Sequence, residues 1–230
     1  MTKQALIVRG GWDGHQPIET TTSFIPFLKA NDYTVRVEED SAIYADQQIM
    51  SGIDLIVQTN TMNTIEDEPL KGLIDAVIAG TGLAGWHGGI ADSYRASADY
   101  LQLIGGQFAH HAGVHPSLRK GEQSDNYLPH RVNIVPERRN HPIVADIVDF
   151  DLITEQYWVL SDSYNDVLAT TTVEAREFDP WHRPITTPSI WTREWGNGRI
   201  FVSTPGHRLE VIDTHPVRTI IERGLLWASR

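Results

Sequence analysis

The sequence predicts an α/β protein in which helices cover a mostly parallel sheet. Short apolar runs alternate with segments of helical periodicity in the first part of the chain, as in repeated strand–helix–strand units. These runs are continuously apolar, which is typical of strands that are buried on both faces. No linker or internal repeat divides the 230 residues, so we expect a single domain over residues 1–230.

The first elements follow from local patterns. Residues 4–9 form an apolar run that ends in two glycines and predicts a strand. Residues 20–30 carry three large apolar side chains at helical spacing, although Pro26 limits how early this helix can be regular. Residues 33–38 alternate between apolar and polar side chains, which predicts a second strand.

Two further strands complete the parallel pattern. Residues 54–58 and 83–86 predict buried strands, and residues 66–79 between them predict an amphipathic helix. Right-handed crossovers bring the carboxyl ends of such strands to one rim of the sheet, where ligands of open α/β sheets bind. The residues expected at this rim are Gly10–Gly11, Asn60–Thr61 and His87–Gly88.

The pattern breaks after His87. Residues 92–104 predict a helix, and a stretch rich in Gly and His follows with little apolar periodicity. We interpret residues 90–130 as an insertion or cap that lies over the rim. The remaining expected elements are strands at residues 132–135, 154–160, 167–175, 189–194 and 199–203 and a final helix at residues 216–228. The WGNG turn predicts that the last two strands form a hairpin.

Composition excludes several classes of partner and chemistry. The formal net charge of −11 argues against nucleic acid or an anionic membrane as the main partner. The absence of cysteine removes disulfides, thiolate metal sites and a Cys nucleophile. The amino-terminal segment is too short and polar for a signal peptide, and no apolar run reaches the length of a membrane span. We therefore expect a cytoplasmic protein with a small-molecule substrate, and the sequence leaves room for a homo-oligomer.

His87 is the first candidate functional residue, because it follows a buried strand and precedes Gly88 and Gly89. Such a turn lets the backbone approach a ligand closely and is where many α/β enzymes carry a nucleophile. The imidazole could act as a base or as a metal ligand, or it could only cap the loop through hydrogen bonds.

Glu155 and Tyr157 form a second candidate group. Two residues apart on one strand, they would share a face, and a buried carboxylate and phenol both need partners. The alternative is the exposed face of an edge strand.

Other histidines occupy positions of interest. Of the adjacent His110 and His111, only one is expected to face a given site, and both could belong to a polar loop. His207 follows a strand and so should lie at a strand end. His215 precedes the final helix, where it could instead act as a cap.

Several common catalytic and cofactor-binding motifs are missing from the sequence. GxGxxG does not follow the first strand, and GxxxxGK[ST], GxSxG and HExxH are absent from the chain. Three histidines and a glutamate at separate strand ends do match the ligands of zinc or a similar divalent metal, although no short spacing such as HxH adds support. The candidate metal ligands are His87, His111, Glu155 and His207.

Four stretches in order resemble the trehalose-utilisation (ThuA-like) family. They are GLAGWHGG, YLQLIGGQFAHH, HPIVADIVDFDLITEQYW and WTREWGNGRIFVSTPGH, and the final LLWA also fits. The resemblance covers about residues 70–230. It implies a flavodoxin-like three-layer sandwich of the class I glutamine amidotransferase-like superfamily. Carried over by position, the implied pocket residues are His87, His111 (or His110), Glu155, Tyr157 and His207.

The resemblance also bears on the reaction. True amidotransferases of this superfamily carry a catalytic Cys after the strand that here ends before His87. Because the chain has no Cys, glutaminase activity is excluded. The family instead suggests a carbohydrate or keto-sugar substrate.

We therefore expect a sugar-processing enzyme that works by isomerisation or elimination next to a carbonyl, or by hydrolysis. Glu155 would be the general acid or base, while His87 and His207 would polarise an oxygen or hold a divalent metal. Trp158 is a further candidate for stacking on a sugar ring. The expected substrate pocket is lined by Trp12, Asp13, His15, Trp86, Gly88, His110 and His215. The alternatives are a non-catalytic sugar- or metabolite-binding protein and a subunit of a sugar dehydrogenase system.

Overall fold

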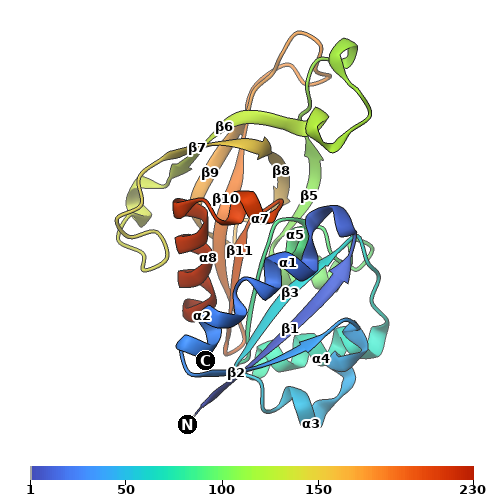
Figure 1. The fold of residues 1–230 in the computed structure, drawn as a ribbon, viewed down its shortest axis with the longest axis vertical. Helices are drawn as coiled ribbons and strands as arrows, with labels where there is room; N and C mark the ends of the chain where they lie inside the picture. Colours follow the sequence, from blue (N-terminus) through green and yellow to red (C-terminus); the bar gives the residue numbers. More distant parts are fainter. Residues whose placement is uncertain (1) are drawn as a thin grey trace.

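A nine-stranded mixed sheet forms the centre of the molecule in the computed structural model, which describes residues 2–230 (Figure 1). The strands lie in the order β2-β1-β3-β4-β11-β10-β9-β6-β7. From β2 to β11 all neighbours are parallel, and from β11 to β7 all neighbours are antiparallel. The bounds are β1 Lys3–Gly11, β2 Tyr33–Glu38, β3 Leu55–Thr61, β4 Gly82–Trp86, β6 Tyr127–Ile134, β7 Phe150–Glu155, β9 Asp166–Val173, β10 Ile185–Trp195 and β11 Gly198–Ser203.

Helices cover both faces of the parallel half. The helices are α1 Pro17–Thr22, α2 Ile25–Ala30, α3 Gln47–Met50, α4 Asp67–Ala79, α5 Gly88–Ala91, α6 Ala98–Ile104, α7 Leu209–Ile212 and α8 His215–Ala228. Ile7 of β1 belongs to a core shared with α2 and α8, whereas its neighbours Leu6 and Val8 belong to a core shared with α4 and α6. This alternation gives three layers, and the predicted α/β class is confirmed.

Two expected elements are interrupted in the structure. The helix expected over residues 20–30 is two short helices, with Pro26 in the first turn of α2. The single strand expected over residues 154–160 is wrong, because Gln156 separates β7 from a strand of another sheet, β8 (Tyr157–Ser161). Gln156 Nε2 donates to Thr171 Oγ1 at 2.6 Å and to the Thr172 carbonyl at 2.8 Å. These bonds fix the point where the chain leaves the large sheet.

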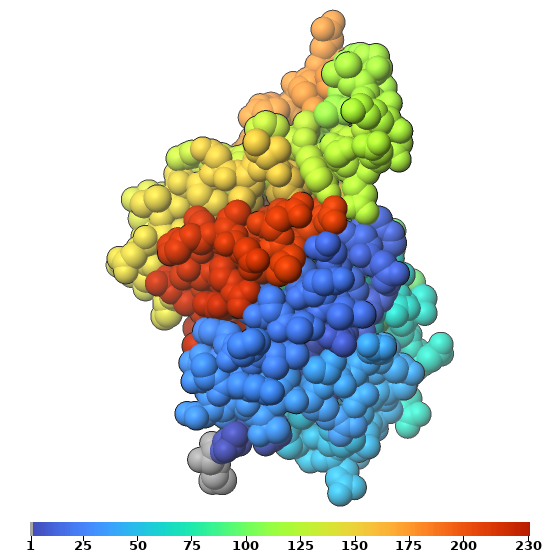
Figure 2. All heavy atoms as spheres, viewed as in Figure 1, coloured from blue at the N-terminus to red at the C-terminus, as the bar shows by residue number. Residues whose placement is uncertain are grey.

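The segment over residues 90–130 has α6 packed on one face of the sheet, and its later part stands above the parallel half (Figures 1 and 2). Its helix is α6, shorter than expected, and it contains an unexpected strand, β5 (Gly106–His111), which pairs with β8 in a two-stranded sheet. The Asp125 carboxylate accepts N–H groups from residues 120–122 and so orders the loop before β6. The short 3-10 turns of the chain are η1 Asp13–His15, η2 Ser41–Ala45, η3 Pro116–Leu118, η4 Gln123–Asn126 and η5 Pro136–Arg138.

Within residues 2–230, no helix is both long enough and apolar enough to cross a membrane.

Candidate functional site

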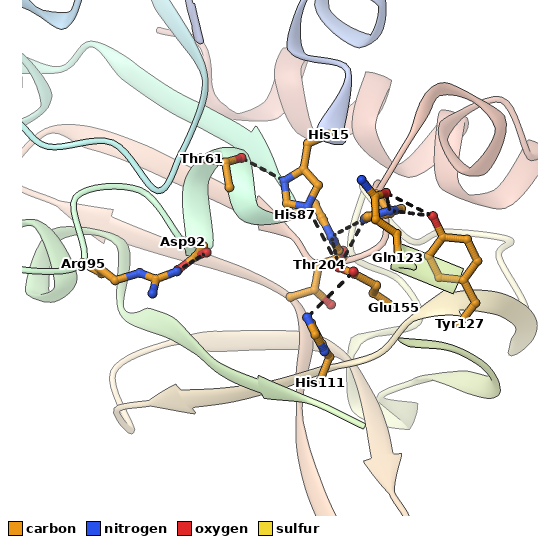
Figure 3. A network of polar contacts seen from close by, with 11 residues as sticks. His15, Thr61, His87, Asp92, Arg95, His111, Gln123, Tyr127, Glu155 and Thr204 are labelled. Atoms are coloured by element: carbon orange, nitrogen blue, oxygen red, sulfur yellow. Dashed lines mark hydrogen bonds and ion pairs between the residues drawn. The ribbon is translucent and has the colours of Figure 1, made fainter. Parts of the chain in front are cut away.

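Side chains from both halves of the sheet meet at the carboxyl ends of the parallel strands (Figure 3). His15 ends η1 after β1, His87 follows β4, and His207 lies in the loop after β11. Glu155 is the last residue of β7, and His111 is the last residue of β5. A pocket of about 180 Å³ opens above them and is lined by Trp12, His15, Thr61, Met62, Asp92, Arg95, Phe108, His111, Gln123, Asn126, Glu155 and Tyr157.

The Glu155 carboxylate is the centre of this cluster. Its Oε2 lies 3.1 Å from His87 Nε2 and 3.2 Å from His207 Nδ1. His207 Nδ1 and His87 Nε2 are 3.1 Å apart, and His15 Nε2 approaches Glu155 Oε2 to 4.0 Å. All four residues are buried, and one ligand atom from each lies within 4.8 Å of the others. These four side chains, which we call the inner centre, form a group that could hold a metal ion.

The outer nitrogen of each inner-centre histidine faces an oxygen atom. His87 Nδ1 donates to the Thr204 carbonyl at 2.7 Å. His15 Nδ1 lies 2.9 Å from Thr61 Oγ1. Two oxygens serve His207 Nε2, the Tyr127 hydroxyl at 2.9 Å and Gln123 Oε1 at 3.3 Å. Each ring is therefore held in one orientation with its other nitrogen directed at Glu155.

The turn after β4 is shaped to carry His87. The backbone of His87 has φ +49° and ψ −143°, a strained conformation for a residue with a side chain. Its N–H donates to the Ser203 carbonyl at 2.6 Å, and its carbonyl accepts from Ala91 N at 2.9 Å, so the turn joins β11 to the start of α5. A Cβ on Gly88 would lie 2.6 Å from His15 Cε1. The glycine predicted to let a ligand approach thus makes room for His15.

Tyr157 also reaches the cluster, although it does not share a strand with Glu155. Its ring packs on the His87 ring, with centroids 4.1 Å apart and planes 31° apart. Burial is the largest cause that raises the pKa of Tyr157 well above its usual value, and the nearby Glu155 and Asp92 carboxylates add to it. The phenol therefore stays protonated at neutral pH.

The charges of the inner centre follow from burial and mutual contact. Burial, and after it the neighbouring His87 and His207, lower the pKa of His15 to about 2. Burial also lowers the pKa of His87, against the opposing effect of its contact with Glu155. Burial alone would raise the pKa of Glu155, but its contacts with His207 and His87 outweigh this and hold the pKa below its usual value. Glu155 is therefore ionised and His15 neutral at pH 7.

Of the two adjacent histidines, His111 is the one that faces the site. His111 Nε2 lies 3.8 Å from Glu155 Oε1, the oxygen that the inner centre does not use. Its Nδ1 is buried and has no hydrogen-bond partner in residues 2–230. His110 is exposed and packs edge-on against Trp181, at 5.5 Å between ring centroids.

The other expected pocket residues are divided. Trp12 lines the pocket, and its ring meets His15 edge-on at 4.8 Å. Trp86 packs in the apolar core against Phe24. Asp13 and His215 are exposed, the latter as the first residue of α8. The structure therefore brings Trp12 and His15 to Glu155 and leaves the other three outside the pocket lining.

Sequence reasoning missed several residues of the pocket. Asp92 is buried, with Oδ2 accepting from Arg95 Nη2 at 2.6 Å, while Oδ1 has no partner among the described residues. Asp92 was expected only as the first residue of a helix over residues 92–104, where nothing marks it as functional. Gln123 and Tyr127 lie in a segment without apolar periodicity. Thr61 was the exception, since its place at the end of a strand put it at the rim.

One family model matches this chain, and several solved structures share its fold. The profile of the ThuA family, described as trehalose utilisation, matches residues 4–228. A solved ThuA-like protein from Bacteroides uniformis superposes with a TM-score of 0.73 at 17% identity, covering 99% of this chain and 91% of that one. One from Parabacteroides merdae gives 0.73 at 14% identity, covering 99% and 90%. A cytoplasmic protein from Salmonella typhimurium LT2 gives 0.66 at 11% identity, covering 99% and 100%.

No curated protein matches the sequence. The solved structures are too distant in sequence to show more than a shared fold. The profile match, in contrast, spans nearly the whole chain and includes every residue of the inner centre. The chain therefore belongs to the ThuA family.

Proposed function

We propose that this ThuA-family protein is an enzyme that moves a proton at a carbon next to the carbonyl group of a keto-sugar. The observation that carries the proposal is the ionised Glu155 carboxylate, buried below a small pocket and surrounded by four histidines. Burying a charged carboxylate costs free energy of folding, and clusters of buried ionisable groups are typical of reaction centres. The family description, trehalose utilisation, supports a carbohydrate as the substrate.

The pocket favours proton transfer over direct glycoside hydrolysis. Most glycosidases use two carboxyl groups, one on each side of the scissile bond. Glu155 and Asp92 are the carboxylates that line this pocket, and Asp92 is paired with Arg95. His111, in contrast, lies beside the inner centre, and its Nδ1 has no hydrogen-bond partner among residues 2–230. A single polarising centre with one adjacent imidazole suits isomerisation or elimination.

The inner centre, His111 and Trp12 have different roles in the proposed reaction. The inner centre would polarise the carbonyl oxygen and stabilise the negative charge that develops there. A divalent metal ion, if held by its histidines and Glu155, would supply this polarisation as a Lewis acid. His111 removes the proton from the neighbouring carbon and returns it to the substrate or to the leaving group. Trp12, 38% exposed beside His15, offers an aromatic face to the apolar side of a sugar ring.

The test is deuterium exchange, because proton removal can be seen even without net turnover. The purified protein is incubated in D₂O with a panel of keto-sugars, and loss of the proton next to the carbonyl is followed by ¹H NMR. We expect exchange by the wild-type protein, reduced about 100-fold or more in His111→Asn. Glu155→Gln should lose exchange as well.

His110→Asn is the matched control, since His110 is adjacent in sequence but points away from Glu155. It should exchange at the wild-type rate. Failure of every keto-sugar to exchange, or equal rates in the wild type and in His111→Asn, would contradict the proposal. A sugar that binds without exchange would identify a binding protein instead.

We also propose a cytoplasmic location for the protein. The negative net charge and the absence of cysteine are consistent with it. The structural neighbour from Salmonella typhimurium is itself described as cytoplasmic.

A further inference from the structure

Three atoms of the inner centre form a nearly equilateral triangle. Its corners are His87 Nε2, His207 Nδ1 and Glu155 Oε2, and its sides are 3.1, 3.1 and 3.2 Å. An ion standing roughly 1 Å outside the plane of this triangle would lie about 2.1 Å from all three corners, the usual length of a zinc–ligand bond. The triangle thus has the dimensions of one face of a metal coordination shell.

Protons alone cannot satisfy this triangle. A proton on one of the three atoms can be shared in hydrogen bonds with the other two atoms. Those two atoms then face each other with lone pairs and no proton between them. If both nitrogens carry a proton, each can donate to Glu155 Oε2. The two N–H groups then repel each other, because the nitrogens are only 3.1 Å apart. His87 in particular already carries a proton on Nδ1, since the Thr204 carbonyl can only accept. A cation bound to all three atoms accepts a lone pair from each of them and so removes both kinds of repulsion.

The oxygens outside the rings favour the same state. Thr204, Thr61 and Gln123 each present an oxygen that can accept the outer N–H of one histidine. With those protons on the outside, every ring directs a lone pair at the centre. A second hydrogen bond of this kind is what orients most metal-bound histidines in proteins.

We propose that the inner centre binds one divalent first-row transition-metal ion through His87 Nε2, His207 Nδ1, Glu155 Oε2 and His15 Nε2. Three imidazoles and one carboxylate suit zinc, iron, cobalt or nickel, whereas magnesium and calcium prefer an all-oxygen shell. The chain has no cysteine, so the site contains no thiolate.

The geometry also revises the ligand set expected from the sequence. His15 takes the place expected for His111, because His111 meets Glu155 through the other oxygen, at 3.8 Å. His15 and Glu155 line the pocket, whereas His87 and His207 lie outside its lining. The pocket therefore approaches the ion from the side of His15, and His111 remains available for proton transfer.

The role of the ion rests on the proposed function, but its binding does not. In that role a bound metal ion acts as a Lewis acid that draws electron density from the carbonyl oxygen. The histidines hold the ion, and Glu155 offsets part of its charge.

The test is a metal titration of the full-length protein after removal of metals by a chelator. We expect about one equivalent of zinc per chain by mass spectrometry after desalting, and visible absorption bands when cobalt(II) is added instead. Glu155→Gln keeps the shape of the side chain and should weaken zinc binding about tenfold or more. His15→Asn should do the same at a less enclosed position, which guards against a variant that fails to fold. Circular dichroism checks folding of both variants.

His110→Asn and His111→Asn are the controls and should bind zinc like the wild type. Substoichiometric zinc in the wild type, or equal affinity in Glu155→Gln and His15→Asn, would overturn the proposal, and so would loss of binding in His110→Asn. The two proposals fail separately. Keto-sugar exchange at full rate in the chelated protein would refute a role for the metal in the reaction, whereas failure to bind zinc would refute the metal site. Stoichiometric zinc without exchange would refute only the reaction.

Discussion

His87 Nε2 lies 3.1 Å from Glu155 Oε2, although 68 positions separate the two residues in the sequence. His87 follows β4 in the parallel half of the sheet, and Glu155 ends β7 in the antiparallel half. The inner centre therefore forms only when the two halves are folded together. A substitution that disturbs the packing of either half should therefore change the geometry of the inner centre.

The hydroxyl of Thr61 should matter to the inner centre, because it holds the outer nitrogen of His15. Thr61→Val keeps the shape of the side chain but removes the oxygen, and we expect zinc affinity to fall about tenfold. Thr59→Val on the same strand is a matched control, since Thr59 is equally buried and its hydroxyl has no partner in the described chain. A competition titration with a chromophoric chelator measures both. Equal affinities in the two variants would show that Thr61 does not orient His15.

Asp92 should affect substrate binding more than the chemical step. It lines the pocket with one carboxylate oxygen paired to Arg95 and the other without a partner among the described residues. We expect a substrate hydroxyl to donate to that oxygen. Asp92→Ala should therefore raise KM about tenfold and leave kcat nearly unchanged. Arg95, half exposed, stays solvated in this variant. A fall in kcat at constant KM would assign Asp92 to the reaction instead.

Tyr157 should act through its ring, because that ring supports His87 at 4.1 Å and also contacts Phe108. Tyr157→Ala should lower the free energy of unfolding by about 3–5 kcal/mol. Tyr157→Phe keeps the ring and should retain activity within about tenfold, since a catalytic acid or base would contribute more than that. Urea denaturation and the exchange assay give the two quantities. A loss of activity well beyond tenfold in a stable Tyr157→Phe would make the phenol a catalytic group.

Stability of the metal-free protein should fall as the pH drops below about 6.5. The pKa of His15 lies near 2 in the folded chain, where burial keeps it neutral, but near its usual value of about 6.5 in the unfolded chain. The unfolded chain therefore binds more protons between these values, and the free energy of unfolding rises with pH there.

The expected loss from His15 between pH 7 and pH 5 is up to about 2 kcal/mol. Urea denaturation in the presence of a chelator measures it, and His15→Asn should show a smaller loss. Working above pH 5 keeps the titration of carboxylates small. A wild-type slope no steeper than that of His15→Asn would show that His15 does not stay neutral in the folded protein.

Much of the parallel half could be predicted from the sequence. Continuous apolar runs marked β3 and β4, and the rule that strand ends converge placed His87 at the rim. His207 was placed by the same reasoning, because a strand precedes it. These predictions rest on local pattern and on topology, which the sequence carries directly.

The rest depends on contacts that local pattern does not contain. Gln156 ends one strand and begins another through bonds to a neighbouring strand, so the expected shared face of Glu155 and Tyr157 rested on a strand that does not exist. The choice of His15 over His111 as the fourth inner residue depends on how Gly88 and Thr61 seat the His15 ring. Neither contact can be predicted from the spacing of residues along the sequence.

Anomalous diffraction at the zinc edge, from crystals grown with zinc and a keto-sugar, would show whether the inner centre holds a metal ion beside the substrate. We predict one strong peak in the pocket region, about 2.1 Å from His87 Nε2, His207 Nδ1 and Glu155 Oε2, with the carbonyl oxygen of the sugar beside it. His111 should lie next to the carbon that carries the exchangeable proton. A peak elsewhere on the chain would contradict the metal site, and a sugar bound away from Glu155 would contradict the proposed reaction.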